Sequence, residues 1–162
     1  MDIRNITLEN FDQVAEIYQQ GIETGMATFQ NDIPDWQSWD KSHLLNCRVA
    51  TFENNEMTGW AALTPVSSRC VYAGVAEVSV YVSANFRGKG IGQRLLTHLI
   101  AQSEQAGLWT LQSGIFPDNI RSIKLHEKCG FRQIGYREKI GKKDGVWKDN
   151  IIMERRSKVV GV

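Results

Sequence analysis

A glycine-rich loop between a β-rich segment and an amphipathic segment is the feature that most constrains the fold of this chain. The loop reads Arg87-Gly88-Lys89-Gly90-Ile91-Gly92. It follows residues 75–82, an alternating Val-rich run that predicts a strand, and it opens residues 91–106, where leucines recur at helical spacing before Gly107. A strand that passes through such a loop into a helix requires a fold in which helices pack on a sheet.

The loop itself predicts a binding site for an anion. Glycines let the backbone approach a ligand closely and adopt positive φ. The first N–H groups of the following helix have no internal partner, and the helix dipole favours negative charge there. Arg87 and Lys89 add positive charge. A pyrophosphate fits these features, although the glycines can also be read as a simple chain turn.

Two familiar nucleotide-binding loops are excluded by the sequence. A Walker loop ends in Gly-Lys-Ser/Thr, which this loop lacks. A dinucleotide-binding loop needs the spacing G-x-G-x-x-G and an acidic residue at a suitable distance, and neither is present.

The rest of the chain predicts strands and helices that are mixed along the sequence. Helices are expected over 11–20, 35–46 and 117–128, and strands over 3–6, 48–52, 58–64, 110–115, 131–137 and 149–154, with a hairpin turn at 53–56. We therefore predict a single domain, residues 1–162, of the α/β (α+β) class. Its mostly antiparallel mixed sheet has about seven strands with a parallel pair at the centre, flanked by about four helices.

Composition narrows the classes of partner. With 19 basic and 18 acidic residues the net charge is +1, which argues against a nucleic-acid partner bound by bulk electrostatics. The three cysteines are far apart and form no C-x-x-C pair, a spacing that favours neither a disulfide framework nor a metal site. No signal peptide or membrane-spanning run is apparent. A cytoplasmic protein without nucleic-acid, membrane or metal partners is expected.

Two motifs of the sequence resemble, in their order along the chain, those of the GNAT superfamily of N-acetyltransferases. The resemblance covers residues 3–154. The loop after Val80-Tyr81-Val82 is similar to the acetyl-CoA signature R/Q-x-x-G-x-G/A, and residues 119–131, ending in Gly-Phe, resemble the second motif. A closer resemblance is to the phosphinothricin and methionine sulfoximine acetyltransferase branch. It rests on Glu77 before the Val-Tyr-Val strand, on His126 in the second motif, and on the Gly-x-Trp-x-Asp of residues 145–149.

The resemblance implies a GNAT fold in which the central strand splays from its parallel neighbour and leaves a slot for acetyl-CoA, the expected co-substrate. The backbone of Val80, Tyr81 and Val82 would pair with the pantetheine, and Asn119, with Ser122 nearby, would contact the same region. The remaining cofactor contacts are implied at the loop and the start of its helix: Arg87, Gly88, Lys89, Gly90, Ile91, Gly92 and Gln93.

The chemistry implied is direct acetyl transfer onto an amine. Glu77 is the candidate general base, on a strand where burial would adapt a carboxylate to that task, and it can act through a water. The backbone N–H of Val80 or Tyr81 would stabilise the oxyanion. His126 stands where many family members carry a Tyr that protonates the leaving thiolate. It could serve as that acid, help to remove the amine proton, or be a core histidine.

The resemblance also suggests the acceptor, a small amino-acid analogue such as phosphinothricin, methionine sulfoximine or methionine sulfone. Arg69 and Lys143 are candidate partners for its anionic groups. Phe29, Tyr72 and Trp36 are candidate walls. Homodimers are common in this branch, so Lys143 and Trp147 can act within one subunit or across two.

Other readings stay open at this point. The same chemistry can serve a polyamine, an aminoglycoside or a protein N-terminus, although an acidic pocket would suit the first two better than Arg69 and Lys143 do. A non-catalytic acyl-CoA-sensing module would bind the cofactor through the same loop and would not need Glu77.

Overall fold

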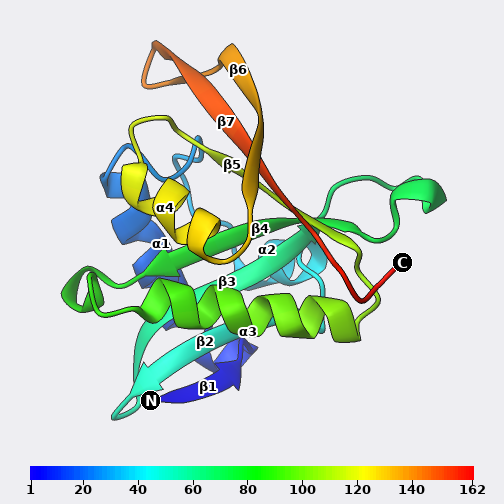
Figure 1. Cartoon of the computed structure of the whole chain (residues 1–162). Coiled ribbons are helices and arrows are strands. Elements are labelled where there is room, and N and C mark those ends of the chain that lie inside the picture. The colour runs from blue at the N-terminus through cyan, green and yellow to red at the C-terminus, as the bar shows by residue number, and fades with distance from the viewer.

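The computed structural model describes all 162 residues and contains one seven-stranded sheet (Figure 1). Across the sheet the order is β1-β2-β3-β4-β5-β7-β6, and every neighbouring pair is antiparallel except β4 and β5. This confirms the predicted mixed sheet with its central parallel pair and four α-helices. The strands are β1 (Asp2–Asn5), β2 (Arg48–Glu53), β3 (Glu56–Pro65), β4 (Val75–Val82), β5 (Thr110–Ile115), β6 (Arg132–Lys143) and β7 (Val146–Arg156), and the helices are α1 (Phe11–Glu23), α2 (Trp36–Ser42), α3 (Ile91–Gln105) and α4 (Ile120–Lys128).

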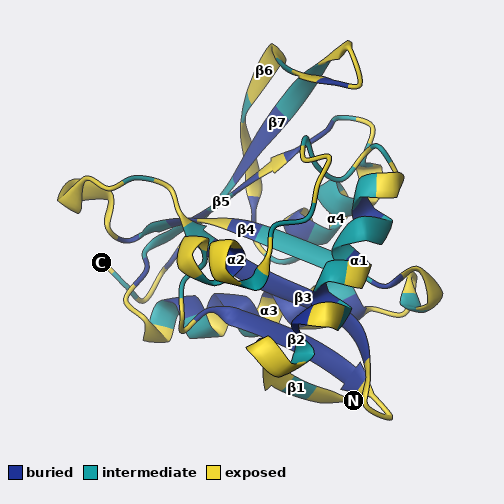
Figure 2. Ribbon diagram, turned by 180° about the vertical axis from the view of Figure 1, so that it is seen from behind, coloured by how far each residue is buried: buried dark blue, intermediate teal, exposed yellow.

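Helices cover both faces of the sheet. Helix α3 packs on one face, where Leu95, Leu96 and Leu99 meet apolar side chains of β2, β3 and β4. Helices α1 and α2 pack on the other face around Trp39 and Trp60, as Figure 2 shows from behind. The central strands are therefore buried on both sides, which explains why β3 reads as an almost continuous apolar run.

The two hairpins differ in how well the sequence predicts them. Asn54 and Asn55 both adopt positive φ between β2 and β3, as predicted for the turn at 53–56. The β6–β7 hairpin is much longer than the predicted strands 131–137 and 149–154 and turns at Asp144 and Gly145, which also have positive φ. Most of β6 is solvent-exposed, so its side chains lack the alternation that marks a half-buried strand.

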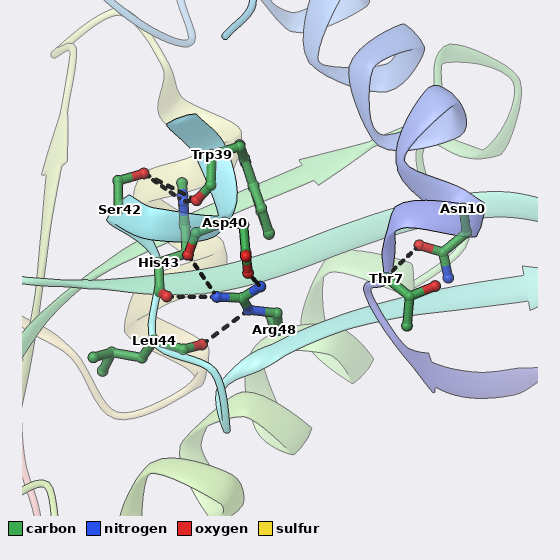
Figure 3. Close-up of polar contacts among 8 residues, drawn as sticks. All are labelled: Thr7, Asn10, Trp39, Asp40, Ser42, His43, Leu44 and Arg48. Carbon is green, nitrogen blue, oxygen red and sulfur yellow. Dashed lines mark hydrogen bonds and ion pairs between the residues drawn. The ribbon is translucent and has the colours of Figure 1, made fainter. Parts of the chain in front are cut away.

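Helix α2 is shorter than the predicted helix 35–46, and a buried arginine explains where it ends. The Arg48 guanidinium donates to the carbonyl oxygens of Asp40 (2.9 Å), His43 (2.6 Å) and Leu44 (3.1 Å), and it pairs with the Asp40 carboxylate (Figure 3). These carbonyls lie at and beyond the end of α2, where a helix leaves acceptors unpaired. Figure 3 also shows the bond from the Thr7 N–H to Asn10 Oδ1 (2.9 Å) that precedes α1.

The centre of the sheet opens at the parallel pair. β4 and β5 are paired only from Val75 to Glu77, opposite Thr110 to Gln112. Beyond Glu77, β4 stays paired with β3 as far as Val82, whereas β5 follows β7 away from it (Figure 1). The edge of β4 from Val78 to Val82 therefore has no strand partner on the β5 side. None of the helices is long and apolar enough to cross a membrane.

Candidate functional site

The glycine-rich loop forms one wall of a cavity of about 480 Å³, here called the loop groove. Gly88 and Gly90 adopt positive φ (77° and 78°), and Gly90 is the residue before α3. The backbone N–H groups of Ile91, Gly92 and Gln93 open that helix and have no i−4 partner within it. Of the predicted cofactor-binding residues, all in the loop and the start of α3 line the groove except Lys89, whose ammonium lies 5.1 Å from the centre of the Phe86 ring.

Positive side chains that the sequence analysis did not single out face the same groove. Arg121, Lys124 and Lys128 of α4 line it together with Arg87, and no acidic residue does. Their spacing of three and four residues places them on one side of the helix, a signal that was available in the sequence. The groove therefore has the charge and the free helix N-terminus that a phosphorylated ligand requires.

A second cavity of about 430 Å³, here called the inner cavity, adjoins the loop groove. Val80 and Tyr81 of the free β4 edge line both, so the two cavities meet where the sheet opens. Asn119 and Ser122 also line both. Asn119 Oδ1 accepts from the N–H of Ser122 (3.3 Å) at the start of α4, and its Nδ2 donates to the carbonyl of Met26 (3.4 Å). This amide thus fixes the loop after α1 against α4 at the junction.

Glu77 lies at the point where β4 and β5 part, and it lines the inner cavity. The expectation that it is buried is wrong, because its side chain is exposed to the open cavity. Its only polar contact is a long one, with Gln112 Nε2 at 3.5 Å from its Oε1. The carboxylate is therefore free to accept a proton or to hold a water.

His126 of α4 lines the inner cavity although only 1% of its surface is exposed. Its Nδ1 lies 2.7 Å from the carbonyl oxygen of Ser122, which can only accept, so Nδ1 carries the proton. Nε2 is then a buried acceptor, and it has no hydrogen-bond partner. Burial lowers the pKa of His126, partly opposed by the bond to Ser122, so the imidazole is neutral near pH 7.

Among the predicted substrate residues, only Phe29 lines the inner cavity. Its ring packs edge-on against Phe116, which also lines the cavity (centroids 4.7 Å apart). Arg69 and Tyr72 contact each other (5.6 Å from guanidinium to ring centre) in the β3–β4 connection. That connection extends from the side of the sheet opposite to the glycine-rich loop (Figure 1), and neither residue reaches the cavity.

Three further residues that the sequence suggested for the substrate site also lie outside the inner cavity. Lys143 is 4% exposed, and its ammonium donates to the Gln30 carbonyl (2.9 Å) and to Asn31 Oδ1 (2.6 Å), so it fastens the loop after α1. Trp36 packs on Phe11 in the core beneath α2. Trp147 is exposed on the β6–β7 hairpin.

The inner cavity also contains polar residues that sequence reasoning missed. Arg137 of β6 and Asn150 of β7 line this cavity. Both strands are longer than the sequence predicted, and neither residue was predicted to belong to the site. They are direct neighbours across the hairpin, which places their side chains on the same face.

Comparison with known proteins agrees with this geometry. The model of the Acetyltransferase (GNAT) family matches residues 11–131. Phosphinothricin N-acetyltransferase of Alcaligenes faecalis is 29% identical, over 94% of this chain and 81% of its own. The L-methionine sulfoximine/L-methionine sulfone acetyltransferase of Salmonella typhimurium is 30% identical, over 87% and 85%.

A solved structure has the same fold with the cofactor bound. The phosphinothricin acetyltransferase of Sinorhizobium meliloti in complex with acetyl-CoA superposes with a TM-score of 0.87 at 25% identity, covering 99% of this chain and 90% of that one. The family match spans well over half of the chain and includes both motifs around the loop groove. The chain therefore belongs to the GNAT family and is an N-acetyltransferase that uses acetyl-CoA as its co-substrate.

Proposed function

We propose that this enzyme acetylates the amino group of a small amino-acid analogue such as phosphinothricin, methionine sulfoximine or methionine sulfone. The observation that carries the proposal is the junction of two cavities at the free edge of β4, with Glu77 and His126 facing only the inner one. The relatives named for these three substrates, which match most of the chain, support the choice of acceptor.

In this proposal acetyl-CoA occupies the loop groove. Its pyrophosphate binds the N–H groups of Gly88 to Gln93 and the cations beside them, and its pantetheine follows the edge of β4 at Val80 to Val82 that has no strand partner on the β5 side. Asn119 and Ser122 stand beside the pantetheine. The thioester then lies at the junction, where the N–H of Val80 or Tyr81 can stabilise the oxyanion of the tetrahedral intermediate.

The acceptor amine occupies the inner cavity and must lose a proton before it attacks. Glu77 removes this proton, directly or through a water, since its carboxylate lacks a strong partner. The amine nitrogen then bonds to the thioester carbon, and the carbon–sulfur bond breaks as the intermediate collapses. Much of the rate acceleration comes from holding both substrates in this geometry.

A second proton leaves the nitrogen when the amide forms, and the thiolate of CoA needs one. His126 fits this step because the residue lines the inner cavity and its neutral, buried Nε2 has no hydrogen-bond partner. It accepts the proton from the intermediate and returns it to the sulfur. This assigns His126 as an acceptor first and a donor second.

We further propose a cytoplasmic homodimer. Three free cysteines are typical of a reducing compartment. β6 is an edge strand, and the hairpin that it forms with β7 exposes apolar side chains at Ile134, Tyr136, Ile140 and Trp147. In such a dimer Trp147 can approach the neighbouring site. Light scattering on the purified protein tests the dimer, and a monomer with full activity would contradict it.

The substrate proposal is tested by following CoA release with a thiol reagent over a panel of amines. The panel contains methionine sulfoximine, methionine sulfone, phosphinothricin, spermidine, an aminoglycoside and a short peptide. Turnover of one or more of the first three above the others is expected. Turnover of spermidine, the aminoglycoside or the peptide alone would contradict the proposed acceptor and leave the acetyltransferase assignment in place.

A further inference from the structure

Arg137 of β6 is the one permanently charged cationic residue among those that line the inner cavity. Of the other lining residues only Glu77 carries a carboxyl group and only His126 an imidazole. Burial lowers the pKa of His126, so its imidazole is neutral at pH 7. None of the four ion pairs in the molecule involves Arg137. An unpaired arginine beside an otherwise weakly charged cavity is suited to bind an anion that arrives with the ligand.

An irregularity in β6 aims this part of the strand at the cavity. Arg137 pairs with Asn150 and Gly141 with Lys148, so three residues of β6 stand opposite Asp149 alone. In a regular strand, Arg137 and Ile140 would face opposite sides because they are three residues apart. With the bulge between them, both line the inner cavity.

The bulge is held by the carboxylate of Asp149. Its Oδ1 accepts from the N–H of Lys139 (2.7 Å), which has a positive φ of 46°, and its other oxygen accepts from the Tyr136 hydroxyl. Both bonds lower the pKa of Asp149, the Tyr136 bond most, so the carboxylate is ionised at neutral pH. Asp149 therefore fixes the backbone on the C-terminal side of Arg137.

Asn150 completes the polar surface beside the guanidinium. It lies against β5, where a Cβ on Gly114 would stand 3.0 Å from its Oδ1. Because Asn150 and Arg137 are cross-strand neighbours on one face, a single small anionic group can contact both.

We propose that Arg137 determines acceptor specificity by binding the α-carboxylate of the acceptor, with Asn150 as a second hydrogen-bond donor. This inference rests on the proposed function and deepens it, since it makes the carboxylate a requirement for good acceptors. It replaces Arg69 and Lys143 in that role within one subunit. A guanidinium in the cavity also disfavours polycationic acceptors such as polyamines.

The test compares methionine sulfone with 3-(methylsulfonyl)propylamine, which has the same amine and sulfone but no carboxylate. kcat/KM for each is measured at saturating acetyl-CoA in the wild type and in Arg137→Gln, Arg137→Lys, Arg69→Gln and Arg132→Gln. Arg132, also on β6, forms an exposed ion pair with Glu154 (3.3 Å) outside the cavity and serves as the matched control.

The wild type should prefer the carboxylated acceptor strongly. In Arg137→Gln this preference should fall roughly tenfold to a hundredfold, the range expected for a charged hydrogen-bonded contact. Arg137→Lys should keep part of it. Turnover of the decarboxylated amine, the KM for acetyl-CoA and all values for Arg132→Gln should stay within about twofold, as for surface substitutions in general.

Four outcomes would overturn the assignment. An equal loss with both acceptors in Arg137→Gln would reveal a structural role alone. An unchanged preference would remove Arg137 from the site, and a loss of preference in Arg69→Gln instead would transfer the role to Arg69. If the wild type acetylates spermidine and not methionine sulfone, the proposed substrate class fails and this inference fails with it.

Discussion

Gly21 of α1 lies directly against the ring of Tyr81 in β4, so closely that a Cβ on residue 21 would stand 2.7 Å from two ring carbons. The ring cannot move aside easily, because it stacks on Tyr18 and on Trp60 with centroid distances of 5.0 Å. Tyr81 belongs to the strand edge on which both cavities meet. The contact therefore links the packing of α1 to the geometry of the site.

Gly21→Ala should lower both the stability of the enzyme and its kcat/KM for acetyl-CoA. Removing a helical glycine stabilises a helix by about 1 kcal/mol, whereas overpacking costs about 1–3 kcal/mol, so the clash should outweigh the gain. We expect a lower urea midpoint and a several-fold lower kcat/KM for acetyl-CoA. Glu16→Ala, at an exposed position of the same helix, is the control. A stabilised Gly21→Ala enzyme with normal kinetics would show that the Tyr81 ring can move aside without affecting the site.

The protonation state of His126 predicts the acid side of the pH profile. Burial lowers its pKa below the ordinary 6.5, and the neutral form is the one that accepts a proton. Activity should therefore be full above pH 6.5 and be lost as the pH falls through the lowered value. His126→Asn should reduce kcat by roughly a hundredfold or more and remove this limb of the kcat profile. A limb that persists unchanged in the variant belongs to another group.

The cations of α4 predict how the enzyme recognises the phosphates of CoA. Lys124 and Lys128 line the loop groove with no acidic neighbour in its wall. Replacing both with Gln should raise the KM for acetyl-CoA about tenfold and weaken its dependence on salt, because charge–phosphate attraction is screened. The kcat should change little. Lys158→Gln, at an exposed position outside the groove, should leave KM unchanged.

Arg48 predicts a stability effect that is separate from catalysis. Its buried guanidinium donates to three carbonyls and pairs with the Asp40 carboxylate, so Arg48→Gln removes the donor of these partly buried acceptors. The cost should be about 2–4 kcal/mol, read from urea unfolding. The KM values of the folded variant should match the wild type, and a change in them would connect this cluster to the site.

Local patterns were enough to predict the elements that position the cofactor. The bounds of β4 and β5 agree with the sequence reading, because both strands are short runs ended by clear loop residues. The same holds for the start of α3 after the glycine-rich loop and for the turn at Asn54 and Asn55. Glycine spacing and the alternation of apolar and polar residues are local signals, so they can be interpreted without knowledge of the tertiary fold.

The acceptor side was predicted less well because long-range contacts decide it. Lys143 was expected at the substrate, yet it is buried against Gln30 and Asn31, more than a hundred residues earlier in the chain. Arg137 lines the inner cavity beside a bulge that no period-two pattern predicts. The Asp144-Gly145 pair was a readable hairpin signal that would have extended β6 and β7.

The general-base role of Glu77 is tested most directly by Glu77→Gln, with acetyl-CoA binding and acetyl transfer measured on the same preparation. Calorimetry should give the wild-type Kd for acetyl-CoA, because Glu77 does not line the loop groove. With an acceptor from the panel that the wild type acetylates, kcat should fall roughly a hundredfold to ten-thousandfold, the usual contribution of a general base. A kcat within a few-fold of the wild type, with binding intact, would contradict the proposed mechanism.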